Sequence, residues 1–272
     1  MKEQCPSLQP KETKEYADNQ YWDDRYKKSG DDDFEWYYDY ETLKDVFDKY
    51  FDRNVLVVGC GNSNLCEDLA KQHQGRIVGT DISTTVIDEM KRRHAKNKEA
   101  AESLADVEYL ISNITENGFD HAFDVVVDKG TFDALLCGGM EVAGKCFMNS
   151  EYPNDSIGEG SLILISHVSN LDEMQELLSE LVTMLDWEEF KYSAHYAGND
   201  NPAIYVFNKV KRVAGEAFDA TEDMNNVEIT LENYGDEDME EEEDDDEEDM
   251  DDDDEYVEED DDYVDEEECP VC

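Results

Sequence analysis

Two glycines and one carboxylate carry the clearest chemical signal in the sequence. Gly59 and Gly61 follow a short apolar run in VLVVGCGNSNL, and Asp81 stands twenty residues beyond Gly61. Glycines at a strand end let the backbone approach a ligand closely. A carboxylate at the end of the next strand can accept hydrogen bonds from both hydroxyls of a ribose. The spacing therefore predicts a site for a cofactor that contains a ribose.

The glycine loop departs from the dinucleotide-binding pattern G-x-G-x-x-G, because Asn64 stands in place of the third glycine. This departure counts against a loop that binds a pyrophosphate. A single G-x-G also occurs in purely structural turns. The prediction of ribose binding therefore depends on Asp81 as well as on the loop.

Further polar residues follow the next two predicted strands. Asn113 follows the third strand and offers both an acceptor oxygen and an NH₂ donor to an adenine edge. The fourth strand leads into DKGTFD at 128–133, and Asp128, Asp133 and Tyr37 are candidates to orient a reacting amine. His167 and His195 stand near strand ends, where a lone histidine is more often structural than catalytic.

Aromatic residues gather ahead of the first strand. Trp22, Tyr26 and Trp36 lie among polar neighbours. Aromatic faces attract cations, so these side chains can cover a positively charged cofactor and exclude water from it. Isolated aromatics are also common in hydrophobic cores. The sequence leaves both interpretations open.

Strands and helices alternate through the body of the chain. Apolar, β-branched runs predict strands, and apolar stripes with a helical period predict the helices between them. The predicted strands are 55–58, 76–80, 107–111, 124–128, 161–167, 189–195 and 203–209. This alternation is typical of an α/β fold with an open, mostly parallel, Rossmann-like sheet. The last two strands are joined by only a few residues, so they must be antiparallel neighbours.

The charge is extreme and uneven. Residues 236–268 contain 27 Asp or Glu and no Lys or Arg, which leaves −25 of the formal net charge of −52 for the other residues. Such a segment buries too little apolar area to fold. We therefore expect a flexible N-terminus at 1–15, a folded domain at 16–212 and a disordered acidic tail at 213–272. An acidic protein is repelled by nucleic-acid phosphate and suits a basic protein partner.

Several motifs taken together carry a family resemblance. They are YWDDRY, FEWY, VLVVGCGNS, GTDIS and FDVVVDKGTFDAL, in this order between about Tyr16 and Lys209. In this combination the chain resembles the methyltransferase-like 13 and elongation factor 1-alpha lysine methyltransferase 4 group. The resemblance implies a seven-strand class I methyltransferase sheet with an antiparallel last pair.

The same resemblance implies S-adenosylmethionine as the cofactor and lysine of a protein, such as translation elongation factor 1-alpha, as the methyl acceptor. It also implies the cofactor-binding residues, which are Trp22, Tyr26, Trp36, Gly59, Gly61, Asp81, Ile82, Asn113, Ile114 and Lys129. Asn113 stands where the family commonly has Asp. The acidic tail lies outside the resemblance.

Two alternatives remain open from the sequence: an acidic-tailed binding module for basic proteins, and a methyltransferase for small molecules. We expect no nucleic-acid partner, and no apolar run is long enough to predict a membrane span. The polar N-terminus favours a cytoplasmic protein, with a nuclear location also possible. Cys269 and Cys272 lack a second pair of ligands, so no metal site is predicted.

Overall fold

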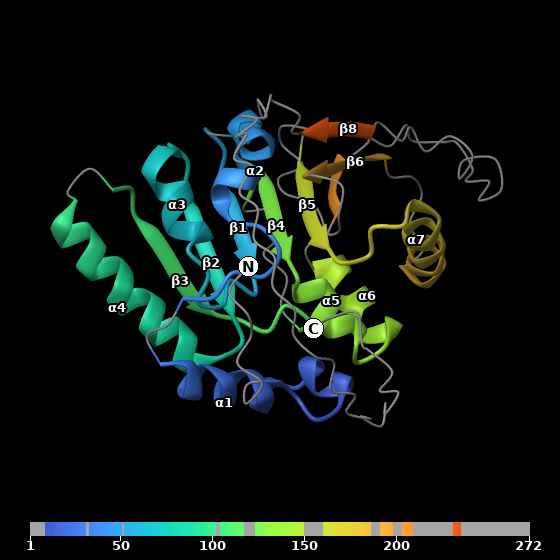
Figure 1. The fold of residues 1–272 in the computed structure, drawn as a ribbon, viewed down its shortest axis with the longest axis horizontal. Coiled ribbons are helices and arrows are strands. Elements are labelled where there is room, and N and C mark those ends of the chain that lie inside the picture. The colour runs from blue at the N-terminus through green and yellow to red at the C-terminus, as the bar shows by residue number, and fades with distance from the viewer. Residues whose placement is uncertain are drawn as a thin grey trace, which may run out of the picture.

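The computed structural model describes residues 9–30, 33–50, 52–101, 104–116, 123–149, 160–185, 191–197, 203–208 and 231–234. These residues form an eight-stranded sheet in the order β3-β2-β1-β4-β5-β7-β6-β8 (Figure 1). The strands are β1 (Val55–Val58), β2 (Ile77–Asp81), β3 (Val107–Ile111), β4 (Val125–Lys129), β5 (Ser161–Ser166), β6 (Lys191–Ala197), β7 (Ala203–Asn208) and β8 (Leu231–Tyr234).

The central strands are buried on both faces, which explains their continuous apolar sequences. In β1, Val55 and Val57 belong to one apolar cluster, and Leu56 and Val58 belong to the other. The first cluster is covered by α2 (Tyr40–Phe47), α3 (Leu65–Gln72) and α4 (Thr84–Ala100). The second is covered by α5 (Thr131–Leu136), α6 (Met140–Asn149) and α7 (Leu171–Leu185). The helices on both faces leave the carboxyl edge of the sheet for a site.

The predicted sheet is confirmed in its parallel part and in its antiparallel ending. Strand β7 pairs antiparallel with both β5 and β6. The structure adds one strand that the sequence analysis does not predict: β8 pairs parallel with β6 and lies within the segment assigned to the tail. A four-residue edge strand is held mainly by backbone hydrogen bonds, so it leaves little hydrophobic pattern in the sequence.

The N-terminal elements cross the carboxyl edge of the sheet. Helix α1 (Asn19–Ser29) follows a short 3₁₀ turn (η2, Thr13–Ala17) and lies below the strand ends in Figure 1. Its N-cap, Asp18, accepts a hydrogen bond of 2.9 Å from the backbone N–H of Gln20. The sequence analysis does not predict α1, because its buried residues include Arg25 as well as Tyr26 and its apolar stripe is weak. A second 3₁₀ turn, η3 (Asp48–Tyr50), follows α2.

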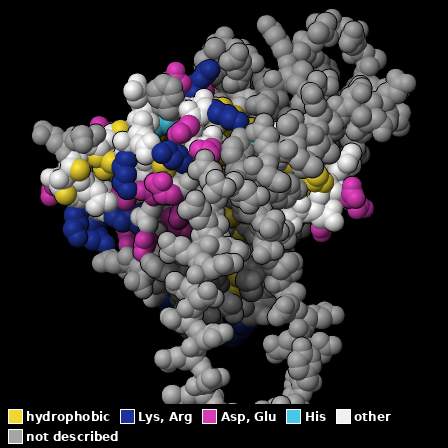
Figure 2. Space-filling view, turned by 45° about the horizontal axis from the view of Figure 1, so that its top comes forward, with side chains coloured by type: hydrophobic (Ala, Val, Ile, Leu, Met, Phe, Trp, Pro, Cys, Tyr) yellow, Lys and Arg dark blue, Asp and Glu magenta, His cyan; other side chains and the backbone are white. Residues whose placement is uncertain are grey.

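The surface of the described part carries mixed charge. On the face shown in Figure 2, acidic side chains lie among Lys and Arg side chains. Exposed ion pairs of the described part include Arg76 with Glu108 at 2.6 Å and Lys71 with Asp68 at 2.5 Å. In the described ranges, no helix is both long enough and apolar enough to cross a bilayer. The strongly acidic run 236–268 and Cys269–Cys272 lie outside the described residues.

Candidate cofactor site and substrate edge

One cavity lies at the carboxyl edge of the sheet, between β1, β2, β4 and the N-terminal segment. It encloses about 900 Å³, part of which is open to solvent. All ten residues that the sequence analysis assigns to cofactor binding line this cavity: Trp22, Tyr26, Trp36, Gly59, Gly61, Asp81, Ile82, Asn113, Ile114 and Lys129. Residues that are far apart in the chain thus form one concave surface.

Asp81 is the buried carboxylate of the cavity, with only 6% of its surface exposed. Its Oδ2 accepts the backbone N–H of Gly61 at 3.0 Å, and its Oδ1 accepts the N–H of Ser83 at 2.9 Å. Burial raises the pKa of Asp81 to about 6, although these hydrogen bonds oppose the shift. Each carboxylate oxygen keeps a further lone pair. The side chain is therefore fixed by the glycine loop and can still accept hydrogen bonds from a ligand.

The two glycines of the loop are required for steric reasons. Both have positive φ angles, +56° at Gly59 and +50° at Gly61. A Cβ at Gly59 would lie 1.9 Å from the Oγ1 of Thr131, and a Cβ at Gly61 would lie 2.8 Å from the hydroxyl of Tyr26. Any side chain here would therefore push apart the loop, α5 and the aromatic residues of α1.

Glu35 is a site residue that the sequence analysis missed. Its carboxylate accepts hydrogen bonds from the Oγ of Ser63 at 2.7 Å and from the backbone N–H of Asn64 at 2.5 Å. It also accepts from the Nζ of Lys129 at 2.7 Å. Lys129 donates a second bond of 2.9 Å to the carbonyl oxygen of Trp36. Glu35 therefore joins the N-terminal segment to the glycine loop and to the end of β4. The sequence signal that could have identified Glu35 is an acidic residue between the aromatic residues of FEWY.

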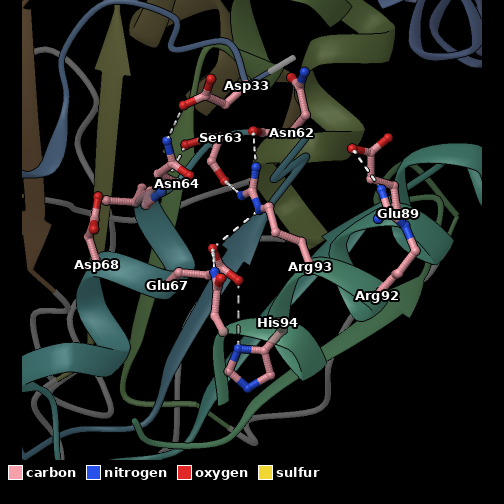
Figure 3. Close-up of polar contacts among 12 residues, drawn as sticks. Asp33, Asn62, Ser63, Asn64, Glu67, Asp68, Glu89, Arg92, Arg93 and His94 are labelled. Atoms are coloured by element: carbon pink, nitrogen blue, oxygen red, sulfur yellow. Dashed lines mark hydrogen bonds and ion pairs between the residues drawn. The ribbon is translucent and has the colours of Figure 1, made fainter. Parts of the chain in front are cut away.

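Arg93 supports the glycine loop from the side of α4 (Figure 3). Its guanidinium donates to the carbonyl oxygens of Asn62 at 3.0 Å and Ser63 at 2.7 Å, and it forms an ion pair with Glu67 at 3.2 Å. Glu67 is 5% exposed and accepts a further bond of 3.0 Å from Asn97. Arg93 falls on the buried stripe of α4, three residues after Met90. A basic residue at such an apolar position is a signal that the sequence analysis did not use.

Aromatic side chains form the wall of the cavity opposite the sheet. Trp22 stacks on Tyr26 with ring centroids 6.0 Å apart, and it meets Trp36 edge to face at 6.4 Å. The guanidinium carbon of Arg25 lies 5.9 Å from the ring of Trp22 and 5.6 Å from that of Trp36. Asp23 ties the helix to the sheet edge through a bond of 2.6 Å from the hydroxyl of Ser83. Tyr26 is buried, whereas Trp22 and Trp36 are half-buried and line the cavity. These aromatics therefore pack on one another and also line the cavity, and their contact with a cofactor stays a prediction.

Asn113 lines the cavity with its amide oxygen already engaged. The Oδ1 atom accepts the backbone N–H of Thr115 at 3.1 Å and its hydroxyl at 2.8 Å. These two bonds use both lone pairs of the oxygen. Asn113 can therefore offer a ligand its NH₂ group, whereas an aspartate would offer an acceptor.

Among the three catalytic candidates, Asp128 makes its contacts with the backbone that follows β4. Its Oδ1 accepts the N–H groups of Thr131 at 2.9 Å and Phe132 at 3.0 Å. Its Oδ2 accepts a weak bond from the thiol of Cys146 at 3.7 Å. Burial raises its pKa to about 7. Asp128 is not part of the cavity lining, so its catalytic role stays a prediction without a contact in its favour.

Asp133 and Tyr37 meet beside the cavity. The hydroxyl of Tyr37 donates a bond of 2.6 Å to the Oδ2 of Asp133. Asp133 also accepts from the Oγ of Ser166 at 2.7 Å and from the backbone N–H of His167 at 3.1 Å. The Nδ1 of His167 lies 3.3 Å from the same carboxylate. His195 lies elsewhere and contacts the hydroxyl of Ser193 at 2.8 Å.

In the part of the chain that the structure describes, no group of three or more His, Cys, Asp or Glu side chains is arranged to hold a metal ion. Buried donors, a buried carboxylate and aromatic walls fit an organic ligand with both polar and apolar parts.

Comparison with known proteins gives relatives for part of the chain. The chain is 38% identical over 132 residues to "eEF1A lysine and N-terminal methyltransferase" of Danio rerio, a match that covers 47% of this chain and 18% of that protein. The corresponding protein of Xenopus laevis is 34% identical over 219 residues, which are 76% of this chain and 31% of that protein. "EEF1A lysine methyltransferase 4" of Bos taurus is 35% identical over 140 residues, covering 50% and 51% of the two chains. The chain thus spans only a part of the curated relatives it matches.

Among solved structures, magnesium protoporphyrin IX methyltransferase from Synechocystis PCC 6803 with bound SAM gives a TM-score of 0.46 at 15% identity, over 78% of this chain and 87% of that one. A family described as "Methyltransferase domain" matches residues 52–198. The matched residues run from before β1 to the end of β6 and include the glycine loop and Asp81. Because this match extends over more than half of the 272 residues, the chain belongs to the methyltransferase domain family.

Proposed function

We propose that this protein transfers a methyl group from S-adenosylmethionine to a lysine side chain of a protein. The observation that carries the proposal is the single cavity lined by all ten predicted cofactor residues. The relatives named above are lysine methyltransferases by name, and the solved structure named above holds the same cofactor.

The residues of the cavity fit the parts of this cofactor. Asp81 accepts the ribose hydroxyls, and Asn113 and Ile114 meet the adenine through the NH₂ group of Asn113 and the apolar surface of Ile114. Lys129, whose Nζ is paired with Glu35, offers a positive charge to the carboxylate of the methionine part. When bound, S-adenosylmethionine supplies an electrophilic methyl group on a sulfonium, and the faces of Trp22 and Trp36 favour that positive charge.

Residues of the protein have to favour the neutral form of the substrate lysine. A lysine amine must be neutral to react, and its pKa in water is about 10.4. The aromatic wall and the apolar residues of the cavity exclude water, which lowers the pKa of an ammonium group that enters. Tyr37 lies behind Gly130, since a Cβ at that glycine would be 3.2 Å from the Tyr37 ring. Gly130 lines the cavity, and we propose that Tyr37, which packs beside this glycine, uses its hydroxyl to orient an arriving amine.

For the acceptor we propose a basic protein, and translation elongation factor 1-alpha by analogy with the named relatives. Formal net charge supports this choice, since the chain carries −52 and repels nucleic acid. The acidic segment 236–268 would increase the rate of encounter with a basic protein. A cytoplasmic site of action fits a translation factor as acceptor.

The proposal is tested by methyl transfer with the full-length protein. Labelled S-adenosylmethionine is incubated with purified elongation factor 1-alpha and with a cell extract treated to remove existing methyl groups, and the labelled residues are mapped by mass spectrometry. The expected result is label on lysine, reduced in Asp81→Ala at limiting cofactor and retained in Asp88→Ala, an exposed position on α4. Label only on small molecules would support the small-molecule alternative. Binding of basic proteins without any transfer would support the binding module.

A further inference from the structure

A chain of polar groups runs from the cavity edge to the surface through α5. It begins at Tyr37, passes through the carboxylate of Asp133 and ends at His167, which directly follows β5. The three residues come from the N-terminal segment, from α5 and from the loop after β5. We propose that this chain removes the proton from the substrate ammonium group, with His167 as the group that delivers it to solvent. The inference rests on the proposed function and adds a proton path to it.

The geometry makes Asp133 a connecting group instead of a contact for the substrate. Its side chain is fully buried, and its two oxygens accept from Tyr37, Ser166 and the backbone of His167. An amine in the cavity therefore cannot reach it directly. The hydroxyl of Tyr37 donates its proton to Asp133 and so keeps its lone pairs for a donor on its other side.

Tyr37 is held in this position at a conformational cost. It is the one non-glycine residue of the described ranges with a positive φ, +62°. A non-glycine residue in this region costs about 1–3 kcal/mol and persists only where its surroundings impose it. The hydroxyl bond to Asp133 and the contact with Gly130 supply that constraint. Strain of this kind is common in active sites.

His167 is the residue from which the proton leaves for solvent. Its Nδ1 lies 3.3 Å from the Oδ2 of Asp133, and 20% of its side chain is exposed. The Nδ1 atom has no hydrogen-bond partner of good geometry in the described part of the chain. The charged groups that face it are Asp133 from α5 and Glu173 from α7, and together they raise its pKa despite burial. A histidine between a buried carboxylate and water can take up and release protons near neutral pH.

The proton moves in balanced steps. The ammonium gives a proton to the oxygen of Tyr37 while Tyr37 gives its own proton to Asp133. Asp133 then passes a proton to the neutral Nδ1 of His167, and the resulting imidazolium loses its Nε2 proton to water. Proton exchange with water returns the imidazole to its Nε2–H tautomer before the next turnover. Tyr37 ends neutral and Asp133 ends as a carboxylate. Burial and the charges of Asp133 and Asp128 raise the pKa of Tyr37, so it passes the proton on without becoming a phenolate.

The first experiment follows His167 without any cofactor. Proton NMR of the full-length protein gives the pKa of the His167 imidazole in wild type and in Asp133→Asn. Removing the negative charge should lower this pKa by about one unit, because Asp133 is the strongest group that raises it. An unchanged pKa in Asp133→Asn would show that the two groups are not coupled and would overturn the path.

The second experiment compares pH profiles of single-turnover methyl transfer between pH 6 and 10. Wild type should reach a plateau above the pKa of His167. His167→Gln should lose about 10²-fold at pH 7.5, a typical contribution of acid–base catalysis, and recover as pH approaches 10. Tyr37→Phe should show the same recovery. The matched control is His73→Gln, since His73 contacts the carbonyl of Arg53 at the opposite edge of the sheet.

The outcomes separate the two proposals. Transfer by wild type with the same pH profile in His167→Gln would overturn the proton path alone. No transfer by wild type at any pH would overturn the proposed function and the path with it. A uniform loss of rate at every pH in His167→Gln would assign His167 a structural role and would also overturn the path.

Discussion

Arg93 donates a hydrogen bond of 2.7 Å to the carbonyl oxygen of Ser63, so helix α4 holds the loop that precedes α3. Its second bond goes to the carbonyl of Asn62, and both residues line the cavity. On the other side of the loop, the N–H of Gly61 donates to Asp81. The orientation of the loop thus depends on a side chain that is not part of the cavity lining.

Replacing Arg93 by Lys should weaken cofactor binding about tenfold, because one ammonium cannot span two carbonyls as a planar guanidinium does. A hydrogen bond to a charged group is worth about 1.5–3 kcal/mol. Calorimetry with S-adenosylmethionine measures the effect. The control is Arg92→Lys, at an exposed position next to it on the same helix. Equal affinity in Arg93→Lys and wild type would show that the loop keeps its shape without the guanidinium.

Removing the carboxylate of Asp81 should cost about 1–3 kcal/mol of cofactor affinity. Asp81→Ala leaves the ribose hydroxyls without acceptors and frees the N–H of Gly61 in a buried place. Calorimetry on wild type and variant at pH 7.5 gives the difference directly. Circular dichroism checks that the variant is folded. An unchanged dissociation constant would remove Asp81 from the site.

Cofactor affinity should also depend on pH through Asp81. Its pKa is raised to about 6 in the free protein, so the carboxyl is largely ionised at pH 7.5 and protonated below pH 6. The ionised form accepts both ribose hydroxyls, so binding favours it and releases a proton near pH 6. Affinity should therefore fall as pH decreases through 6, by up to about tenfold per unit. Calorimetry in buffers of different ionisation enthalpy detects the released proton, which Asp81→Ala should not release.

Trp36→Ala should weaken cofactor binding while the domain stays folded. Trp36 is half-buried and lines the cavity, so its loss opens the aromatic wall. If Trp36 acted only as core, truncation would cost about 3–5 kcal/mol of folding free energy and leave affinity per folded molecule unchanged. Phe47→Ala is the matched core control, since Phe47, the last residue of α2, is 2% exposed and belongs to the first apolar cluster. The melting temperature and the dissociation constant of each variant separate the two effects.

Deleting the residues after Tyr234 should slow encounter with a basic protein at low salt. The removed segment holds the 27 acidic residues of 236–268. Charge attraction is screened over about 8 Å at physiological salt, so the difference in kcat/KM should shrink as salt increases. Turnover at saturating substrate should barely change. Identical specificity constants at all salt concentrations would leave the segment a role in solubility alone.

The sequence was sufficient to predict the position of residues that stand at the ends of adjacent strands. The strand, the glycine loop and Asp81 form one local unit, and the structure places them as predicted. Asp128 shows the limit of this reasoning, since a carboxylate at a strand end can face a ligand or hold the next turn. The structure shows contacts only with the next turn and Cys146. Which of the two occurs depends on side-chain direction, and the residue type carries no information about that.

Contacts between residues that are distant along the chain could not be predicted from the sequence. Arg93 lies 30 residues from Ser63, and Glu35 lies 94 residues from Lys129. Neither pair has a local pattern, because each partner is set by how helices and segments pack on the sheet. Strand β8 was missed for a related reason, since four residues on an edge carry too little alternation to stand out.

The position of the aromatic wall at the start of the chain has a consequence for folding. Glu35 is synthesised 94 residues before Lys129, so α1 and the residues after it leave the ribosome before β4 and α5 exist. Closing such a distant contact costs chain entropy that local contacts do not. The wall therefore docks after the parallel strands have assembled, and we expect it to be the first part to detach when the native state opens locally. A nascent chain acquires the ability to hold its cofactor only in this late step.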